Sequence, residues 1–194
     1  MAVETKPTVV RRRRCPQGKC RATVRRATPA VLGLALLVAA LCAGKPSAAD
    51  EPGLLALGIG AFDVVRLDEP AADVRLEYRH GEGLWIFQPW LGVEASSEGA
   101  VFGVAGVFSD FALGRHVIVS PSIGVGAFHR GGGLNLGSVI EFRSQLEVAY
   151  QFADEKRLGV AFSHVSNAGI GDHNTGTEIA TLYYAIPLTF YGQP

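Results

Sequence analysis

The sequence lacks the features of a helical membrane protein and of a disulfide-stabilised domain. Residues 50–194 contain no run of 18 apolar residues and no sustained apolar repeat at i, i+3, i+4 and i+7. This excludes a bundle of membrane-spanning helices. The 3 cysteines all fall within residues 1–49. The rest of the chain therefore depends on neither disulfides nor a cysteine metal site.

An excess of one sign of charge is also missing, because the formal net charge is +0. This neutrality averages two unlike parts. Residues 1–49 hold 10 of the 18 basic residues and 1 of the 18 acidic ones, which leaves 8 basic and 17 acidic residues in 50–194. Such an acidic body does not neutralise phosphates along a backbone, so we expect no nucleic-acid partner.

Residues 1–49 are typical of a secretory signal peptide. A basic region around 11–14 is followed by an apolar run from Ala30 to Gly44 and by the small residues Ser47 and Ala49. The run of 15 residues is shorter than the roughly 20 that a membrane-spanning helix needs. We expect cleavage after Ala49 and a mature domain of residues 50–194.

The remaining chain consists of short segments in which apolar and polar residues alternate, as strands do. Eight segments show this pattern. They are Leu54 to Val64, Asp73 to His80, Leu84 to Glu94, Ala100 to Phe111, His116 to Phe128, Ser138 to Ala153, Arg157 to Ser166 and Glu178 to Phe190. A tilted transmembrane strand needs about 9 to 11 residues, and small outer-membrane barrels have eight such strands. The predicted fold is all-β, an eight-stranded antiparallel transmembrane β-barrel of the bacterial outer membrane.

Alternation alone does not exclude a soluble β-sandwich or a lipocalin-like barrel, in which the polar face turns outward. Aromatic residues near segment ends, such as Trp85, Trp90 and Phe128, favour a membrane barrel because aromatic girdles mark membrane interfaces. The last segment also ends on an aromatic residue, Phe190. In the membrane barrel, we expect a salt-bridged interior formed by Arg75, Glu77, Arg79, Glu141, Arg143 and Glu147.

The last two segments bring a histidine, a serine and a glutamate together. His164 and Ser166 share the apolar face at the end of one segment, and Glu178 lies on the apolar face at the start of the next. In an acyl transfer Ser166 would attack, His164 would take its proton and Glu178 would orient the imidazole. Isolated polar groups on a lipid-facing wall cost a few kcal/mol, on the order of the penalty for an unpaired buried group. A hydrogen-bonded set that meets a lipid substrate is therefore the favoured interpretation.

The remaining polar residues nearby leave some roles open. Asn167, Asn174 and the backbone amides of residues 169–176 are candidate oxyanion donors that the sequence does not rank. Asp172 is an alternative acid, and His173 is expected to be solvated in the loop. The histidines elsewhere in the mature part show no metal-ligand spacing, so we expect neither a metal nor another cofactor.

The stretch from His164 to Glu178, HVSNAGIGDHNTGTE, resembles the signature of the lipid A 3-O-deacylases (PagL-like proteins). That pattern is a histidine, one residue, a serine and an asparagine, then a loop with a further asparagine and glycine, and a glutamate 12 residues after the serine. His164, Ser166 and Glu178 match the triad of the family, and Asn167 and Asn174 match its asparagines.

The resemblance implies an outer-membrane barrel of a Gram-negative cell that hydrolyses the ester-linked acyl chain at position 3 of lipid A. Lipopolysaccharide and outer-membrane lipids are then the expected partners. The alternative is a non-catalytic small barrel that acts in membrane stability, adhesion or recognition, for which long exposed loops would be the mark. The predicted connections are mostly short. The sequence leaves the oligomeric state open, with a homodimer as one alternative.

Overall fold

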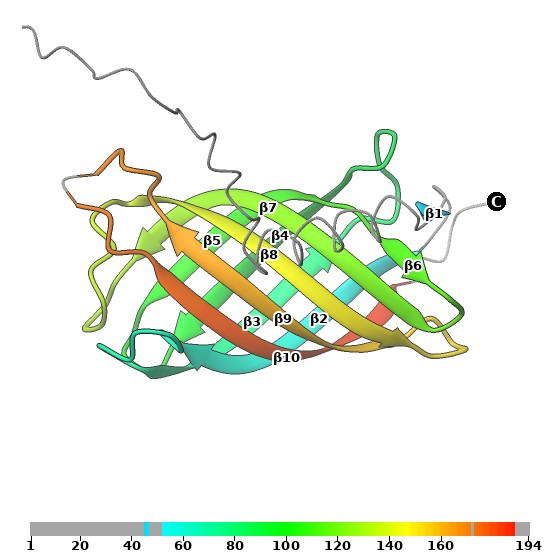
Figure 1. Cartoon of the computed structure of the whole chain (residues 1–194), viewed down its shortest axis with the longest axis horizontal. Coiled ribbons are helices and arrows are strands. Elements are labelled where there is room, and N and C mark those ends of the chain that lie inside the picture. The colour runs from blue at the N-terminus through cyan, green and yellow to red at the C-terminus, as the bar shows by residue number, and fades with distance from the viewer. Residues whose placement is uncertain (1–44, 47–51, 172, 189–194) are drawn as a thin grey trace, which may run out of the picture.

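The protein folds as a closed antiparallel β-barrel (Figure 1). The computed structural model describes residues 45–46, 52–171 and 173–188. This part of the chain contains no helix that is long and apolar enough to cross a membrane. Eight strands form the wall. They are β2 (Gly53–Phe62), β3 (Ala71–Arg79), β4 (Gln88–Ser96), β5 (Val101–Phe108), β7 (Val117–His129), β8 (Ile140–Gln151), β9 (Arg157–Ser166) and β10 (Thr177–Leu188). The last strand, β10, pairs with the first, β2, which closes the sheet.

The predicted all-β barrel is confirmed, with two differences in strand boundaries. The predicted start at Leu84 is wrong, because β4 begins at Gln88 and residues 84–87 form a tight turn. In this turn the Leu84 N–H donates to the Phe87 carbonyl at 2.9 Å, and Trp85 has a φ of 61°. The apolar run LWIF looked like a strand because turn residues at a membrane interface can be apolar as well.

The second difference divides the predicted segment from Ala100 to Phe111. After β5, a short strand β6 (Phe111–Leu113) also pairs with β7. At the break between them, Asp110 is buried, accepts a hydrogen bond from the Ser120 hydroxyl and pairs with Arg157. The inward Asp110 carboxylate thus finds its partners inside the barrel at the point where the regular alternation of β5 stops. A two-residue strand, β1 (Lys45–Pro46), pairs with β6.

Side-chain orientation decides between a membrane barrel and a soluble one. The strands turn apolar side chains outward, where residues such as Leu57, Ile123 and Phe162 are exposed. They turn charged side chains inward, where residues such as Glu77 and Arg143 are almost completely buried. A soluble barrel would show the reverse arrangement, so the apolar outer wall is that of a transmembrane barrel.

The interior holds an ion-pair network, as predicted. The Arg79 guanidinium bonds Glu147 at 2.8 Å and Glu77 at 2.9 Å, while Arg143 pairs with both Glu77 and Glu94. Arg75 joins through Glu77 and Glu94 at 3.5 Å. Among the residues predicted for the network, Glu141 is buried but forms no ion pair with the described residues.

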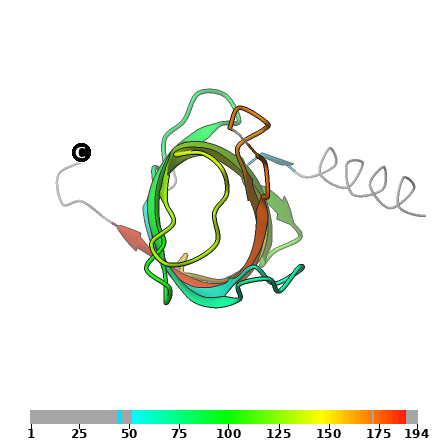
Figure 2. The same ribbon diagram turned by 90° about the vertical axis from the view of Figure 1, so that its left-hand side faces the viewer.

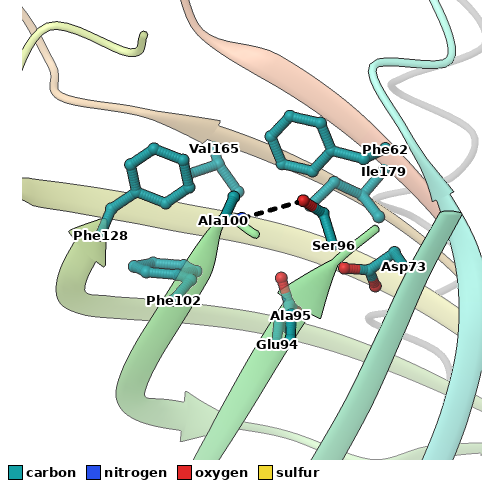
Figure 3. A pocket seen from close by; sticks show the side chains of 10 residues that line it. All are labelled: Phe62, Asp73, Glu94, Ala95, Ser96, Ala100, Phe102, Phe128, Val165 and Ile179. Atoms are coloured by element: carbon teal, nitrogen blue, oxygen red, sulfur yellow. Dashed lines mark hydrogen bonds between the residues drawn. The ribbon is translucent and has the colours of Figure 1, made fainter. Parts of the chain in front are cut away.

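One end of the barrel is closed by an apolar cluster. The connection between β7 and β8, residues 130–139, curls across the opening (Figure 2). It buries Leu134 and Leu136 against inward residues of the wall, including Val165 of β9 and Ile179 of β10. Side chains of the same cluster and its neighbours, drawn in Figure 3, leave a space of only about 10 Å³, at the limit for one water. A lipid chain cannot occupy the interior at this level.

Several sequence expectations fall outside the described residues. These are the signal peptide with its cleavage after Ala49, the terminal aromatic Phe190 and the alternative acid Asp172. The division into a removed segment 1–49 and a barrel domain 50–194 remains a prediction.

The network predicts a large effect for Glu77→Gln, which keeps the side-chain volume and removes a charge shared by three arginines. Breaking a buried ion pair costs about 3–5 kcal/mol of unfolding free energy. Urea titration followed by the electrophoretic shift between folded and unfolded barrel measures this loss. The neighbouring outward residue provides the control, Leu76→Val, with an expected cost below about 1.5 kcal/mol. Equal urea midpoints for Glu77→Gln and the control would contradict the assigned role.

Candidate active site

The site lies where β9 ends and β10 begins, on the outer wall at the plugged end of the barrel. Glu178 is the direct cross-strand partner of His164. Glu178 Oε1 lies 3.0 Å from His164 Nδ1, with the imidazole 47% and the carboxylate side chain 22% exposed. A carboxylate at Nδ1 fixes the tautomer and leaves Nε2 available as a base.

Ser166 lies two residues beyond His164 and faces the same side of the strand. The predicted juxtaposition of the two on the outer face is therefore present, and Glu178 lies next to them. Within the described residues the Ser166 hydroxyl makes no hydrogen bond to the imidazole. Such contacts are often long without substrate and shorten when it binds.

Gly176 brings the loop backbone against this pair. Its φ is +62°, and a Cβ added there would lie 3.1 Å from His164 Cε1 and 3.5 Å from Ser166 Cβ. A side chain at this position would be strained in its backbone and would push against the imidazole. The absence of a side chain lets the peptide approach His164 and Ser166.

A hollow of about 480 Å³ in the outer wall begins at Ser166 and His164 and extends across β8 and β7 to β5. Ser144, which pairs with His164 across the strands, lies at its polar end. Phe142, Ile123, Val125 and Ala105 form its apolar part. The hollow opens to the outside of the barrel, and its mostly apolar lining suits an apolar ligand such as a hydrocarbon chain.

Asn167 and Asn174 hold the loops behind the site. The buried Asn167 side chain donates to the Leu136 carbonyl at 2.9 Å and to the His173 carbonyl at 2.7 Å. Asn174 Oδ1 accepts the Asn167 backbone N–H at 3.2 Å. Both amide hydrogens of Asn167 are thus engaged in holding the 130–139 connection to the β9–β10 connection.

The other polar candidates stay peripheral. His173 is exposed, and its Nε2 lies 3.3 Å from the Asn135 carbonyl. In the described part of the chain, no three His, Cys, Asp or Glu side chains are close enough to hold a metal ion together.

Comparison with known proteins identifies the family. The family model described as "Lipid A 3-O-deacylase (PagL)" matches residues 68–187, a span that includes His164, Ser166 and Glu178. The chain belongs to the lipid A 3-O-deacylase (PagL) family.

Two relatives agree with this PagL assignment. "Lipid A deacylase PagL" of Pseudomonas aeruginosa is 39% identical over 72 residues, which is 36% of this chain and 42% of that protein. The alignment thus spans less than half of this curated relative. The crystal structure of the outer membrane enzyme PagL superposes with a TM-score of 0.56 at 25% identity, over 70% of this chain and 99% of that one. These matches, with the fold, confirm the predicted outer-membrane barrel.

A third match concerns the fold alone. A designed transmembrane β-barrel superposes with a TM-score of 0.52 at 11% identity, over 73% of this chain and 100% of that one. The wall geometry is therefore shared with a barrel outside the PagL family, so the fold alone does not distinguish this chain from such barrels.

Sequence reasoning missed three residues around the PagL motif. Ser144 lies beside His164 only through the β8–β9 register, and Arg66 donates to the Gly176 carbonyl from the β2–β3 connection. Gly176 itself belongs to the motif, but its contact with the imidazole depends on the loop path. A β8–β9 register predicted from the alternation could have placed Ser144 beside His164. No sequence pattern places Arg66 next to Gly176.

The role of Asn167 is tested by Asn167→Ala, which leaves two loop carbonyls without their donor. Each unpaired buried group costs about 1–3 kcal/mol, so amide hydrogen exchange in residues 130–139 should accelerate about 10-fold or more. Asn174→Ala is the matched control, since the exposed Asn174 accepts a single bond, and it should accelerate exchange less. Equal acceleration in the two variants would contradict the proposed difference.

Proposed function

We propose that this PagL family member is an esterase that removes the 3-O-linked acyl chain of lipid A in lipopolysaccharide. The observation that carries the proposal is the 3.0 Å contact between His164 and Glu178 on the apolar outer wall, beside Ser166 and an apolar hollow. Polar groups are costly on a lipid-facing wall, and a charge-assisted pair next to a hydroxyl matches the requirements of acyl transfer.

In the proposed mechanism, Ser166 is the nucleophile. His164 Nε2 takes the hydroxyl proton as Oγ attacks the ester carbonyl, and Glu178 stabilises the imidazolium through Nδ1. Collapse of the tetrahedral intermediate releases the sugar alkoxide, which accepts the proton from His164. A water molecule, activated by the same imidazole, then cleaves the acyl-serine and releases the free fatty acid.

The oxyanion of the intermediate requires preorganised donors. We assign this role to backbone N–H groups of the β9–β10 connection, with Gly176 as the first candidate. A Cβ added at Gly176 would lie within 3.5 Å of both His164 and Ser166, so its peptide is close to them, while the Asn167 amide is committed to two carbonyls.

The substrate is proposed to approach sideways, from the outer leaflet of the membrane. Two observations support this route: the plugged interior has no room for a chain, and the hollow beside Ser166 opens through the apolar wall. We infer that the β9–β10 connection faces the cell exterior, because β2 and β10 run in opposite directions across the wall and their outer ends adjoin the same connections.

Ser166→Ala and His164→Ala test the proposed chemistry. Each should lower the release of 3-hydroxy fatty acid from lipid A by about 10³-fold or more, because loss of one triad member removes the nucleophilic route. Mass spectrometry of lipid A incubated with the purified barrel measures the reaction. Ser163→Ala is the matched control, since Ser163 lies on the same strand and faces the interior. Wild-type rates in folded Ser166→Ala protein would rule out the serine mechanism.

Gly176→Ala tests the close approach of the loop backbone. The added methyl would lie 3.1 Å from His164 Cε1 in a left-handed backbone, so the imidazole or the loop must move. A shift of a few tenths of an ångström should lower the rate, by less than the factor of about 10² that a displacement of about 1 Å can cost. The left-handed conformation should cost about 1–2 kcal/mol in stability. Gly169→Ala, also at positive φ but with open space around it, should keep most of the activity. Equal activities of the two variants would refute the role of Gly176.

A further inference from the structure

We propose that Arg66 binds a phosphate group on the head group of the substrate and thereby holds the scissile ester over Ser166. This inference rests on the proposed function. It assigns an anion site to the β2–β3 connection, residues 63–70, which the catalytic proposal does not use. Lipid A carries its phosphates on the sugars that bear the acyl chains, so one bound molecule can reach both places.

Arg66 is connected to the reacting groups through a single peptide. Its guanidinium donates to the Gly176 carbonyl, and a Cβ added at Gly176 would meet both His164 and Ser166. A ligand bound to Arg66 therefore lies at the edge of the same site. The contact also fixes where the guanidinium points, which reduces the conformational entropy that binding must overcome.

The connection that carries Arg66 is anchored to the site. The Val64 N–H donates to the Glu178 carbonyl at 3.1 Å. The buried Asp63 accepts the Glu69 N–H through its side chain at 2.9 Å and the Leu67 N–H through its carbonyl at 3.2 Å. These bonds make the turn a continuation of the wall beside β10, so Arg66 and Glu178 keep their relative positions.

The guanidinium keeps donors for a ligand. An arginine has five N–H donors in a planar fork that suits phosphate oxygens, and the contact with Gly176 uses one of its nitrogens. Asp68 lies 3.8 Å from Arg66 Nε, with the two side chains 36% and 62% exposed. Such an exposed, long ion pair contributes little, and a phosphate can displace it.

The residues on either side of Arg66 indicate its depth in the membrane. Val65 and Leu67 are 60% and 62% exposed and flank the arginine at the rim of an apolar wall. Exposed apolar side chains there suit the boundary between acyl chains and head groups, with an arginine reaching the phosphates. This arrangement favours a lipid-borne phosphate over a phosphate free in solution.

The other connections at this end make Arg66 distinctive. Within residues 63–70, 97–100, 130–139, 167–171 and 173–176, there are two arginines, Arg66 and Arg130, and no lysine. Arg130 belongs to the connection that plugs the barrel, whereas Arg66 contacts the loop of the site. Arg130 thus provides a control for general attraction of anions to this end.

The test compares Arg66→Gln with the wild-type barrel in detergent micelles, on phosphorylated lipid A and on the same lipid after enzymatic dephosphorylation. Glutamine keeps an amide donor for the Gly176 carbonyl and removes the charge. Loss of a charge-assisted bond predicts a fall in kcat/KM on phosphorylated lipid A of about 10- to 100-fold, mainly through KM. On the dephosphorylated lipid, the variant and the wild type should react at equal rates.

Two variants and one substrate serve as controls. Arg130→Gln, and Arg115→Gln in the turn at the opposite end, should retain the wild-type preference for phosphorylated lipid. If Arg130→Gln lowered kcat/KM on phosphorylated lipid A as much as Arg66→Gln does, the preference would come from the overall charge of this end and the assigned site would be refuted. If Arg66→Gln slowed the phosphorylated lipid, the dephosphorylated lipid and a neutral fatty-acid ester by one common factor, Arg66 would only support Gly176 and the proposal would be overturned.

Inorganic phosphate distinguishes the two sources of the anion. At a concentration equal to that of the lipid it should leave the wild-type rate unchanged, and inhibition of the wild type but not of Arg66→Gln would assign the site to free phosphate instead. The result does not depend on whether Ser166 is the nucleophile. Activity of Ser166→Ala would refute the catalytic proposal, while the phosphate preference would still report on Arg66.

Discussion

Closure of eight strands into one barrel is the constraint on which the rest of this structure depends. It pairs the backbone groups of the wall with one another, which allows the wall to face lipid, and it leaves an interior only wide enough for side chains. The chain fills that interior with paired charges around Arg79, Glu77 and Arg143 and with the apolar cluster around Leu136. The filled interior therefore has no room for a large ligand, which leaves the outer wall as the surface that such a ligand can reach.

On that wall the site depends on support from inside the barrel. His164 and Glu178 face outward, but their neighbours Val165 and Ile179 face inward and pack into the cluster beneath the 130–139 connection. Asn167 joins this connection to the β9–β10 connection. The outward pair therefore lies on a packed layer, which restricts the movement of the two side chains. The β2–β3 connection adds a third support through Val64 and Glu178.

The sequence predicted the wall and the His164, Ser166 and Glu178 juxtaposition well, because both follow from period-two alternation and from contacts between consecutive strands. It did not predict the start of β4, where an apolar turn imitates a strand, or the break at Asp110, which is set by distant partners. It also assigned Asn167 no loop partner. The contacts of Asn167 and Arg66 join connections that lie far apart in sequence, and no local pattern encodes such contacts.

The inward path of the 130–139 connection has a consequence for the cell envelope. The outer membrane is a permeability barrier, and each open barrel in it adds a leak for small solutes. Here the apolar cluster and the charged network occupy the interior in succession, and the space between the side chains at the plugged end is at the limit for a single water. In the described part of the chain, the barrel therefore presents its polar groups on the outer wall without adding a passage through the membrane.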